Sequence, residues 1–380
     1  MFSVSNNMAK NILIIAGESS GDLYGAHLVR ALQEHSPGVS FFGIGGPEMK
    51  KAGVEILYPI DELSIIGVFE VLGKLGVIRA AFRALTQKID RTKTDLAILV
   101  NYPGFNLKFA IELKKRGIPV VFYSSPQVWA WGKWRLGIIK RCVDKMIVFF
   151  KFEKDFYWKN GVEAEFVGHP LVDIVKTTGE LDKMRSGGAS KTVSLVPGSR
   201  RSEINNLFSP MLKAAEIIWS KDNGVRFLVT KHPEMPADIY LKKMRAHELP
   251  LTLVDGKTYD CLAASDLAIV ASGSVTLEAA ILKTPMIITN RISLLNVILY
   301  LLLVRLANVG LVNIIAGKRV MPELLQYDAT PERIAAEALD MLNNAERYRQ
   351  LKEDLDYVNI LVGPPGASSR AAEIILKMLA

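Results

Sequence analysis

Short apolar runs alternate with helical segments through most of this sequence, and each run ends at a turn. Residues 11–16 (NILIIA) end at Gly17, and residues 23–34 then carry apolar side chains at helical spacing. The same order recurs at strand-like runs covering residues 39–44, 96–100, 120–123 and 145–149. This alternation predicts a parallel sheet with helices on both faces.

A second series of strand-like runs follows a polar segment at residues 177–191, which contains Gly and Ser and reads as a linker. A chain of 380 residues is too long for one typical core and suits two domains. We therefore predict an α/β fold of two doubly wound, Rossmann-like domains that face a cleft, with residues 1–175 in the first and residues 176–365 in the second. The runs of the second series are residues 192–196, 226–230, 251–254, 267–270 and 286–289.

Composition excludes several classes of protein. The charge of +8, from 47 basic and 39 acidic residues, fits either a plain basic surface or attraction to anionic phosphates. Basic runs interleaved with aromatic residues are missing, so nucleic acid is not an expected partner. Cys142 and Cys261 lie far apart, which argues against a disulfide framework and for a reducing compartment. The five histidines are scattered singly, so we expect no metal centre.

Two apolar stretches bear on membrane contact. Residues 294–304 contain Asn296 and fall far short of the roughly 20 apolar residues that span a bilayer, so they predict a buried or interfacial helix. Residues 64–78 (SIIGVFEVLGKLGVI) fit a buried helix or an exposed face that enters a membrane or receives acyl chains. Residues 1–10 do not have the pattern of a signal peptide. In the membrane reading, the inserting side chains are Ile66, Val68, Phe69 and Leu72.

The turn at residues 17–22 (GESSGD) lies where the first strand feeds the first helix. Ligands of open α/β sheets gather at such strand ends, and backbone N–H groups at a helix N-terminus suit an anion. The alternative is a tight turn in which Asp22 or Ser20 caps the helix. Neither this turn nor residues 43–48 has the glycine spacing G-x-G-x-x-G of a dinucleotide fingerprint, because Glu48 stands where the third glycine belongs in the latter. The candidate ligand-facing residues are Gly17, Glu18, Ser19, Ser20 and Gly21.

Two further strand-end loops occur in the second half. In the first, Gly198 lets the backbone approach a ligand, Ser199 offers a hydroxyl, and Arg200 can clamp a diphosphate. In the second, Glu278 could accept hydrogen bonds from a ribose diol. The alternatives are a capping turn with surface arginines and a first-turn glutamate at the positive end of a helix. The small residues that leave room for a phosphate in the second loop are Ser272, Gly273, Ser274 and Thr276.

Residues 125–131 (SPQVWAW) place an aromatic cluster directly after a strand. Tryptophan faces pack on sugar rings and acyl chains, but tryptophan is also common in cores. The cluster alone does not decide between these two interpretations.

Six strings in register resemble the lipid-A-disaccharide synthase family. The match extends from about residue 12 to residue 326, and six strings in order are far more specific than any one alone. The strings are residues 16–22 (AGESSGD), 126–131 (PQVWAW), 167–171 (VGHPL), 197–200 (PGSR), 272–278 (SGSVTLE) and 322–326 (PELLQ).

The resemblance implies the GT-B fold, with an acceptor- and lipid-binding first domain that a C-terminal helix at residues 366–380 rejoins. It implies an inverting transfer of 2,3-diacylglucosamine from its UDP derivative to 2,3-diacylglucosamine 1-phosphate, with no cofactor or metal. Arg200 and the loop 272–276 would face the diphosphate of the donor. The other substrate-binding residues would be Gln127, Trp129, Glu278, Asn313, Glu323 and Gln326.

The same resemblance implies a cytoplasmic enzyme that lies peripherally on the inner face of the cytoplasmic membrane. Its partners would be UDP-diacylglucosamine, diacylglucosamine 1-phosphate and inner-membrane lipids. The family often works as a dimer that exchanges C-terminal parts, so a homodimer is among the expectations.

One departure from the family pattern concerns catalysis. The family usually has Ile-Asp-x-Pro-x-Phe-Asn, whereas residues 100–106 read VNYPGFN, so Asn101 replaces the leading candidate for the base. An amide cannot accept a proton as a general base at neutral pH. Either Asn101 orients the acceptor hydroxyl while Glu18 or Asp22 takes the proton, or the chain is slow or inactive. A milder departure is Val312, where the family commonly has Pro.

Three alternatives to this function stay open from the sequence. Asn101 leaves open the first alternative, a protein that keeps the fold and binds nucleotide or lipid with weak or no turnover. Another GT-B transferase, acting on a polyprenyl-linked muropeptide, is disfavoured by residues 17–22 and 126–131. A nicotinamide oxidoreductase is disfavoured because the glycine fingerprint is missing.

Overall fold

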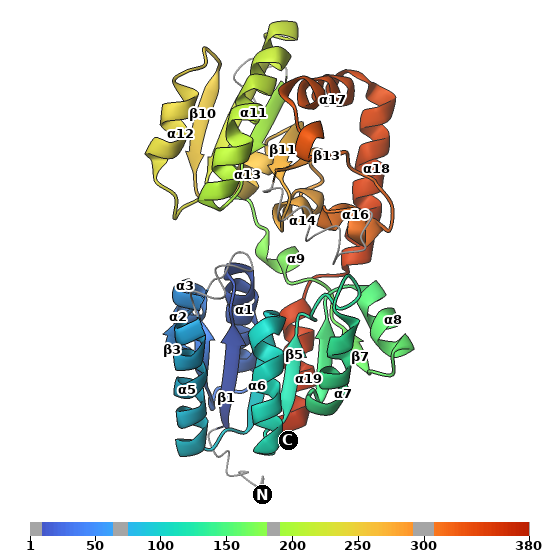
Figure 1. The fold of residues 1–380 in the computed structure, drawn as a ribbon. Helices are drawn as coiled ribbons and strands as arrows, with labels where there is room; N and C mark the ends of the chain where they lie inside the picture. The colour runs from blue at the N-terminus through green and yellow to red at the C-terminus, as the bar shows by residue number, and fades with distance from the viewer. Residues whose placement is uncertain (1–9, 64–74, 181–190, 292–307, 380) are drawn as a thin grey trace, which may run out of the picture. The chain divides into compact units, whose positions relative to one another are not determined.

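The computed structural model describes residues 10–63, 75–180, 191–291 and 308–379 (Figure 1). The chain forms two compact units: Met1–Pro170 with Gly363–Ala380, and Leu171–Val362. Each unit holds one parallel sheet flanked by helices, which confirms the predicted pair of doubly wound α/β domains.

The first unit contains a seven-stranded parallel sheet in the order β3-β2-β1-β4-β5-β6-β7. The direction in which successive strands are added reverses between β1 and β4. The strands are β1 (Lys10–Ala16), β2 (Val39–Gly45), β3 (Glu55–Pro59), β4 (Leu96–Val100), β5 (Val120–Tyr123), β6 (Lys145–Val148) and β7 (Ala164–Phe166).

Helices cover both faces of this sheet (Figure 1). Helices α5, α6 and α7 lie on one face, while α1 and the C-terminal α19 pack against each other on the opposite face. The helices are α1 (Ser19–His35), α2 (Pro47–Lys51), α3 (Ile60–Leu63), α5 (Leu75–Arg91), α6 (Pro103–Lys115), α7 (Leu136–Cys142), α8 (Lys151–Lys159) and α19 (Ala367–Leu379), with a 3₁₀ turn η1 (Lys133–Arg135).

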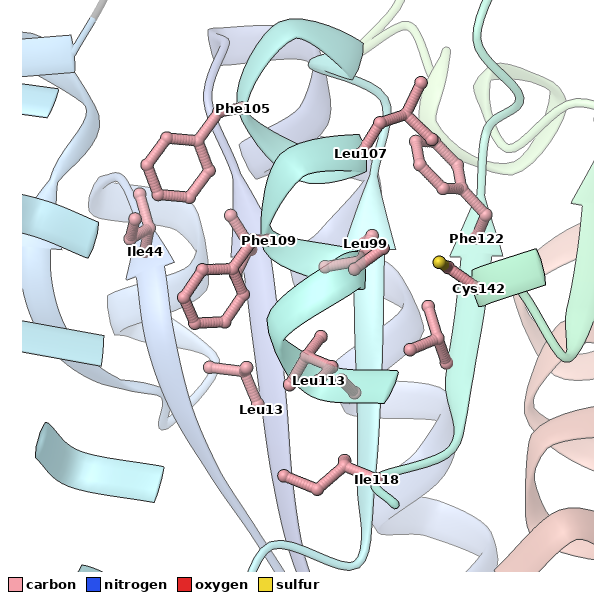
Figure 2. Packing of buried hydrophobic residues seen from close by; sticks show 14 of the residues in the cluster. Leu13, Ile44, Leu99, Phe105, Leu107, Phe109, Leu113, Ile118, Phe122 and Cys142 are labelled. Atoms are coloured by element: carbon pink, nitrogen blue, oxygen red, sulfur yellow. The ribbon is translucent and has the colours of Figure 1, made fainter. Parts of the chain in front are cut away.

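The core beneath α6 fixes the end of β4, which matters for the site. Leu13 and Leu99 lie fully buried on neighbouring strands and face this helix (Figure 2). The rings of Phe105 and Phe109 on α6 lie nearly parallel, with centroids 5.9 Å apart. Full burial of one such side chain contributes about 1.5–3 kcal/mol. The N-terminus of α6 is thereby anchored directly after β4.

The second unit contains a six-stranded parallel sheet in the order β10-β9-β8-β11-β12-β13, and its order reverses between β8 and β11. The strands are β8 (Lys191–Val196), β9 (Val225–Lys231), β10 (Leu251–Asp255), β11 (Leu267–Ala271), β12 (Met286–Asn290) and β13 (Glu323–Leu325). The helices are α9 (Leu171–Ile174), α11 (Arg201–Lys221), α12 (Ala237–Met244), α13 (Thr258–Ala263), α14 (Val275–Ile281), α16 (Leu311–Ala316), α17 (Pro331–Asn343) and α18 (Ala345–Val362), with a 3₁₀ turn η2 (Gln326–Asp328).

Arg370 of α19 hydrogen-bonds to the first unit's backbone next to both points at which the chain crosses between the units, after Pro170 and after Val362. Its Nε and Nη2 donate to the Val167 carbonyl at 3.0 and 2.6 Å. Its guanidinium also donates to the carbonyls of Pro364, at 2.7 Å, and Pro365, at 2.6 Å. Both connecting segments are therefore held by one side chain of the first unit.

The ten strand-like runs of the sequence are confirmed as strands, whereas β3, β7 and β13 were missed. Each of the three is an edge strand, and β7 and β13 have only three residues. The apolar stretch 294–304 and most of 64–78 lie outside the described residues. Within the described part of the chain, no helix is both long and apolar enough to cross a bilayer. Cys142 and Cys261 are free thiols and buried.

Candidate active site

The loops singled out from the sequence lie at equivalent places in the two sheets. In the first unit, the turn 17–22 follows β1 and the segment 101–106 follows β4. In the second unit, the loops 197–203 and 272–278 follow β8 and β11. Each pair therefore flanks the point where its own sheet reverses strand order, and open α/β sheets bind ligands at the carboxyl ends of such strands.

Tyr102 joins the two loops of the first unit. Its ring lies over Gly17, where an added Cβ would meet Cδ1 at 2.2 Å, so a side chain at residue 17 is excluded. The Tyr102 hydroxyl donates to the Leu63 carbonyl at 3.2 Å. Burial raises the pKa of Tyr102, and the negative charge of Glu18 adds to this rise. Glu18 therefore lies within electrostatic reach of the segment that begins at Asn101.

Asn101 and Tyr102 adopt consecutive left-handed conformations, with φ of 45° and 47°. Asparagine tolerates this region better than a bulky residue does, and such strain persists only where neighbours hold the backbone. The Asn101 N–H donates to the Tyr123 carbonyl at 3.1 Å. The buried Asn106 Nδ2 donates to the carbonyls of Asn101 and Val100 at 2.7 and 3.2 Å. The backbone of Asn101 is thus fixed at the end of β4.

The two candidate bases of the first loop differ in their surroundings. Asp22 is 2% exposed, and its carboxylate accepts the N–H groups of Gly46, Glu48 and Met49 at 2.7, 2.9 and 3.1 Å. It therefore caps α2, not the helix α1 on which it lies. Glu18 is exposed at the N-terminus of α1 and is the more accessible carboxylate. Among the other candidates of this turn, Ser19 is exposed, Ser20 is partly exposed and Gly21 is buried.

The aromatic loop after β5 is partly packed and partly exposed. Gln127 is exposed, while Trp129 is half-buried with its ring edge-on to Phe152 at 5.0 Å between centroids. The Arg135 guanidinium lies 3.9 Å from the centroid of the Trp131 ring, which is 37% exposed. In this loop Trp129 therefore packs against the protein, while the Gln127 amide and the Trp131 ring are accessible to solvent.

Glu203 organises the loop after β8. Gly198 has φ of 116°, a conformation that favours glycine, and an added Cβ would lie 2.4 Å from the Glu203 carboxylate. Glu203 Oε2 accepts the N–H groups of Ser199 and Arg200 at 3.0 and 3.2 Å. The Arg200 Nη1 donates to Glu203 Oε1 at 3.2 Å, and the arginine side chain is 55% exposed. The guanidinium is thus oriented at the strand end and accessible.

The loop after β11 has one buried hydroxyl side chain, Thr276, and one exposed at its tip, Ser274. The Ser272 N–H donates to the Thr289 carbonyl at 2.9 Å. Thr276 is fully buried, and its hydroxyl donates to the Gly273 carbonyl at 2.9 Å. Gly273 and Ser274 are exposed at the tip.

Glu278 follows one turn inside α14 and is oriented by that tip. The Ser274 hydroxyl donates to Glu278 Oε1 at 2.9 Å. Burial raises the pKa of Glu278, and the Ser274 hydrogen bond opposes the rise. A carboxylate held in this way has a second oxygen that can accept a ligand hydroxyl.

Asn313 and Glu323 form a buried network in the second unit. Asn313 Nδ2 donates to the Met321 carbonyl and to Glu323 Oε1 at 2.8 and 2.7 Å, and its Oδ1 accepts the Val320 and Met321 N–H groups at 2.8 Å. Glu323 also accepts the Gly310 N–H at 3.0 Å. Both side chains therefore hold the backbone around residues 310 and 320–321 in place, and their direct contact with a nucleotide stays a prediction.

Gln326 begins η2 in a left-handed conformation with φ of 53° and is partly exposed. Ile66, Val68, Phe69 and Leu72 lie outside the described residues. Across residues 10–63, 75–180, 191–291 and 308–379, no group of three or more His, Cys, Asp or Glu is placed to hold a metal ion.

Comparison with known proteins decides the family. The family model for lipid-A-disaccharide synthetase matches residues 12–376. Lipid-A-disaccharide synthase from Syntrophus aciditrophicus (strain SB) is 43% identical over 98% of this chain and 98% of its own length. The Geobacter sulfurreducens enzyme of the same name is 40% identical over 99% of both chains. The chain belongs to the lipid-A-disaccharide synthase family.

Solved structures with the same fold are more distant. The UDP-GlcNAc 2-epimerase from Neisseria meningitidis bound to UDP-GlcNAc has a TM-score of 0.65 at 12% identity, covering 97% of this chain and 100% of that chain. The glycotransferase of kitacinnamycin has a TM-score of 0.65 at 13% identity, covering 98% and 99% of the two chains. These likenesses confirm the GT-B fold of this lipid-A-disaccharide synthase family member, and the family membership makes it a hexosyltransferase.

Sequence reasoning missed several residues that hold the site of this family member. Tyr102 and Asn106 were read only as part of a string, and Glu203 as part of a loop. Glu153, which contacts the aromatic loop, was not considered. Glu153 and Glu203 each lie three residues after the N-cap of a helix, a position at which glutamate accepts N–H groups of the cap. The Ser/Thr-x-x-Glu pattern that marks this position in a sequence is missing from both helices, because their N-caps are Phe150 and Arg200.

Proposed function

We propose that this family member transfers 2,3-diacylglucosamine from UDP-2,3-diacylglucosamine to 2,3-diacylglucosamine 1-phosphate. The acceptor 6-hydroxyl forms a bond to the anomeric carbon while the bond from that carbon to the diphosphate breaks, so the configuration inverts. The products are the β-1′,6-linked disaccharide 1-phosphate and UDP, and the hydroxyl proton passes to a base. The main support is that three of the six family strings, residues 16–22, 197–200 and 272–278, lie at the switch points of the two sheets.

In this proposal the second unit binds the donor. The accessible Arg200 guanidinium and the loop tip at Gly273 and Ser274 stabilise the charge that develops on the leaving diphosphate. Preorganised donors of this kind supply electrostatic stabilisation without a metal ion. Glu278 accepts from a hydroxyl of the donor, and Glu18 in the first unit takes the acceptor proton.

We expect disaccharide and UDP to form in equal amounts when the purified chain is given both lipid substrates. The same rate is expected with excess EDTA, because Arg200 and backbone amides carry the diphosphate charge in this mechanism. Mass spectrometry of the lipid and an enzyme-coupled UDP assay measure the two products. The absence of disaccharide at high enzyme concentration would refute this substrate pair, and a rate abolished by EDTA and restored by Mg²⁺ would refute the metal-free mechanism.

The alternative of a binding protein with little turnover rests on Asn101 alone. It predicts UDP binding without product and recovery of product in Asn101→Asp. The family membership favours the enzyme, because it extends over nearly the whole chain.

We further propose that the protein lies peripherally on the cytoplasmic face of the inner membrane and forms a homodimer, as the resemblance to its family implies. Its two substrates carry acyl chains, so a protein surface in contact with lipid would shorten their path to the site. Residues 64–78 are the apolar segment suited to such contact.

Replacing Ile66, Val68, Phe69 and Leu72 together with serine is expected to move the protein from the membrane fraction to the supernatant. The change removes the apolar area that would enter the headgroup region. Ultracentrifugation of lysates and flotation with vesicles measure the distribution. Ile360→Ser, at a side chain of α18 that is 77% exposed, is the control and should leave the distribution unchanged. If the serine variant partitions as the wild type does, the segment does not drive association.

A further inference from the structure

Glu153 joins two separate parts of the first unit. It lies in the first turn of α8, is 4% exposed, and accepts four hydrogen bonds. Its Oε1 accepts the Ser125 hydroxyl at 2.7 Å and the Trp129 indole N–H at 3.2 Å. Its Oε2 accepts the N–H groups of Phe149 and Phe150 at 3.3 and 3.2 Å. One buried carboxylate therefore ties the loop after β5 to the end of β6.

Helix α8 holds this loop at a further point. Tyr157 lies one turn after Glu153, is fully buried, and donates its hydroxyl to the Pro126 carbonyl at 3.0 Å. Pro126 and Trp129 are thus anchored on either side of Gln127, which remains exposed. The two anchors fix the stretch of backbone from which the Gln127 side chain projects.

We propose that Glu153 is a positioning residue for the glycosyl transfer, because its carboxylate holds residues 125–131 in the arrangement that presents Gln127 to substrate. This inference rests on the proposed function of the loop in substrate binding. Glu153 is buried behind Ser125 and Trp129, so it acts through them. Loss of its acceptor oxygens would leave the Ser125 hydroxyl and the Trp129 indole N–H without this partner.

Glu153 is suited to titrate near neutral pH. Burial raises its pKa to about 7, and the four donors oppose this rise. Tyr157 has a pKa raised by burial, and His169, whose ring lies 5.2 Å from that of Phe150, has a pKa lowered by burial to about 3. Tyr24 packs edge-on to His169. The charged residues of α8 itself are exposed: Lys151, Lys154, Asp155 and Lys159.

Because the pKa of Glu153 is raised, we expect stability and activity to change in opposite directions as pH rises. A folded-state pKa above the ordinary value of 4.5 means that the contribution to stability is full below pH 4.5 and is lost as pH rises through about 7. The ionised carboxylate, however, is the form that accepts all four hydrogen bonds. We therefore expect kcat to rise through about pH 7 while the melting temperature falls slightly.

The test follows the Trp129 indole N–H by NMR, with its signal assigned by loss in Trp129→Phe. In the wild type we expect this signal to titrate with a midpoint near pH 7, because burial raises the pKa of the Glu153 carboxylate to about 7. In Glu153→Gln the titration should vanish and kcat should fall about 10- to 100-fold, the loss typical of hydrogen bonds to a charged group. KM for UDP-sugar should change little, because the donor is assigned to the second unit. Glu153→Asp should recover part of kcat, and Glu165→Gln, at a partly exposed acid of β7, should behave as the wild type.

Two results overturn the inference separately from the proposed function. A Glu153→Gln variant with wild-type kcat, or one in which the Trp129 indole signal does not shift, overturns the inference alone. Glu153→Asp keeps a carboxylate at this position, so a failure of Glu153→Gln to fold does not remove the test. If no variant and no wild-type preparation forms disaccharide, the proposed function fails, and the inference fails with it.

Discussion

Arg200→Ala is expected to lower kcat/KM about 10²- to 10³-fold, the loss typical when one preorganised donor is removed from a developing negative charge. The leaving group in the proposed transfer is a diphosphate, and Arg200 has an accessible guanidinium at the end of β8. Its backbone is held by Glu203, so the side chain starts from a fixed position. The effect should appear mainly in kcat, because charge on the diphosphate grows as the bond breaks.

The controls separate charge, geometry and folding. Arg200→Lys keeps the charge but loses bidentate contact, so we expect an intermediate rate. Arg201→Ala changes the neighbouring exposed arginine and should leave kcat/KM near the wild-type value. Because the exposed Arg200–Glu203 pair contributes little to stability, the melting temperature of Arg200→Ala should stay close to that of the wild type. Steady-state kinetics and a calorimetric UDP titration measure these effects, and unchanged turnover in Arg200→Ala would refute the assigned role.

Interior strands were predictable because both faces of a parallel sheet are buried. Residues 96–100 and 267–271 are fully apolar and fully buried, and such runs have few other interpretations. The edge strand β3 has the half-exposed sequence EILYP, and β7 and β13 are too short to form a pattern. Their positions depend on pairing with a neighbour, which a local pattern does not report.

The strand-end loops could be found from the sequence, but the contacts that hold them could not. Gly17 was identified as a turn glycine, whereas its close contact with Tyr102 depends on the neighbouring position of β1 and β4. Asp22 was interpreted as a cap or a base, and the structure shows that it caps α2 across a separation of 24 residues from Gly46. Long-range hydrogen bonds of this kind follow from topology, not from local residue order.

Glu18→Gln is expected to lower kcat about 10²- to 10⁴-fold, the usual contribution of a general base. Asn101 cannot accept a proton, and Asp22 already accepts three backbone N–H groups in a buried position. Glu18 is exposed at the end of β1 and lies within electrostatic reach of Tyr102. Of the two carboxylates in the turn 17–22, Glu18 is therefore the one that we propose takes the proton.

Asn101→Asp in the Glu18→Gln background is expected to restore a large part of this lost rate. Aspartate tolerates the left-handed conformation of residue 101, where φ is 45°, so the backbone of the loop should not change. Asp22→Asn is the matched control: an amide NH2 in place of one carboxylate oxygen leaves a buried backbone N–H without its acceptor, which should lower stability by about 1–3 kcal/mol with a much smaller effect on kcat. Rates measured at saturating substrate, together with thermal melts, distinguish the three variants. A Glu18→Gln variant that keeps the wild-type rate would exclude Glu18 as the base, and a restored rate in the double variant would show that a carboxylate at either strand end can reach the same hydroxyl.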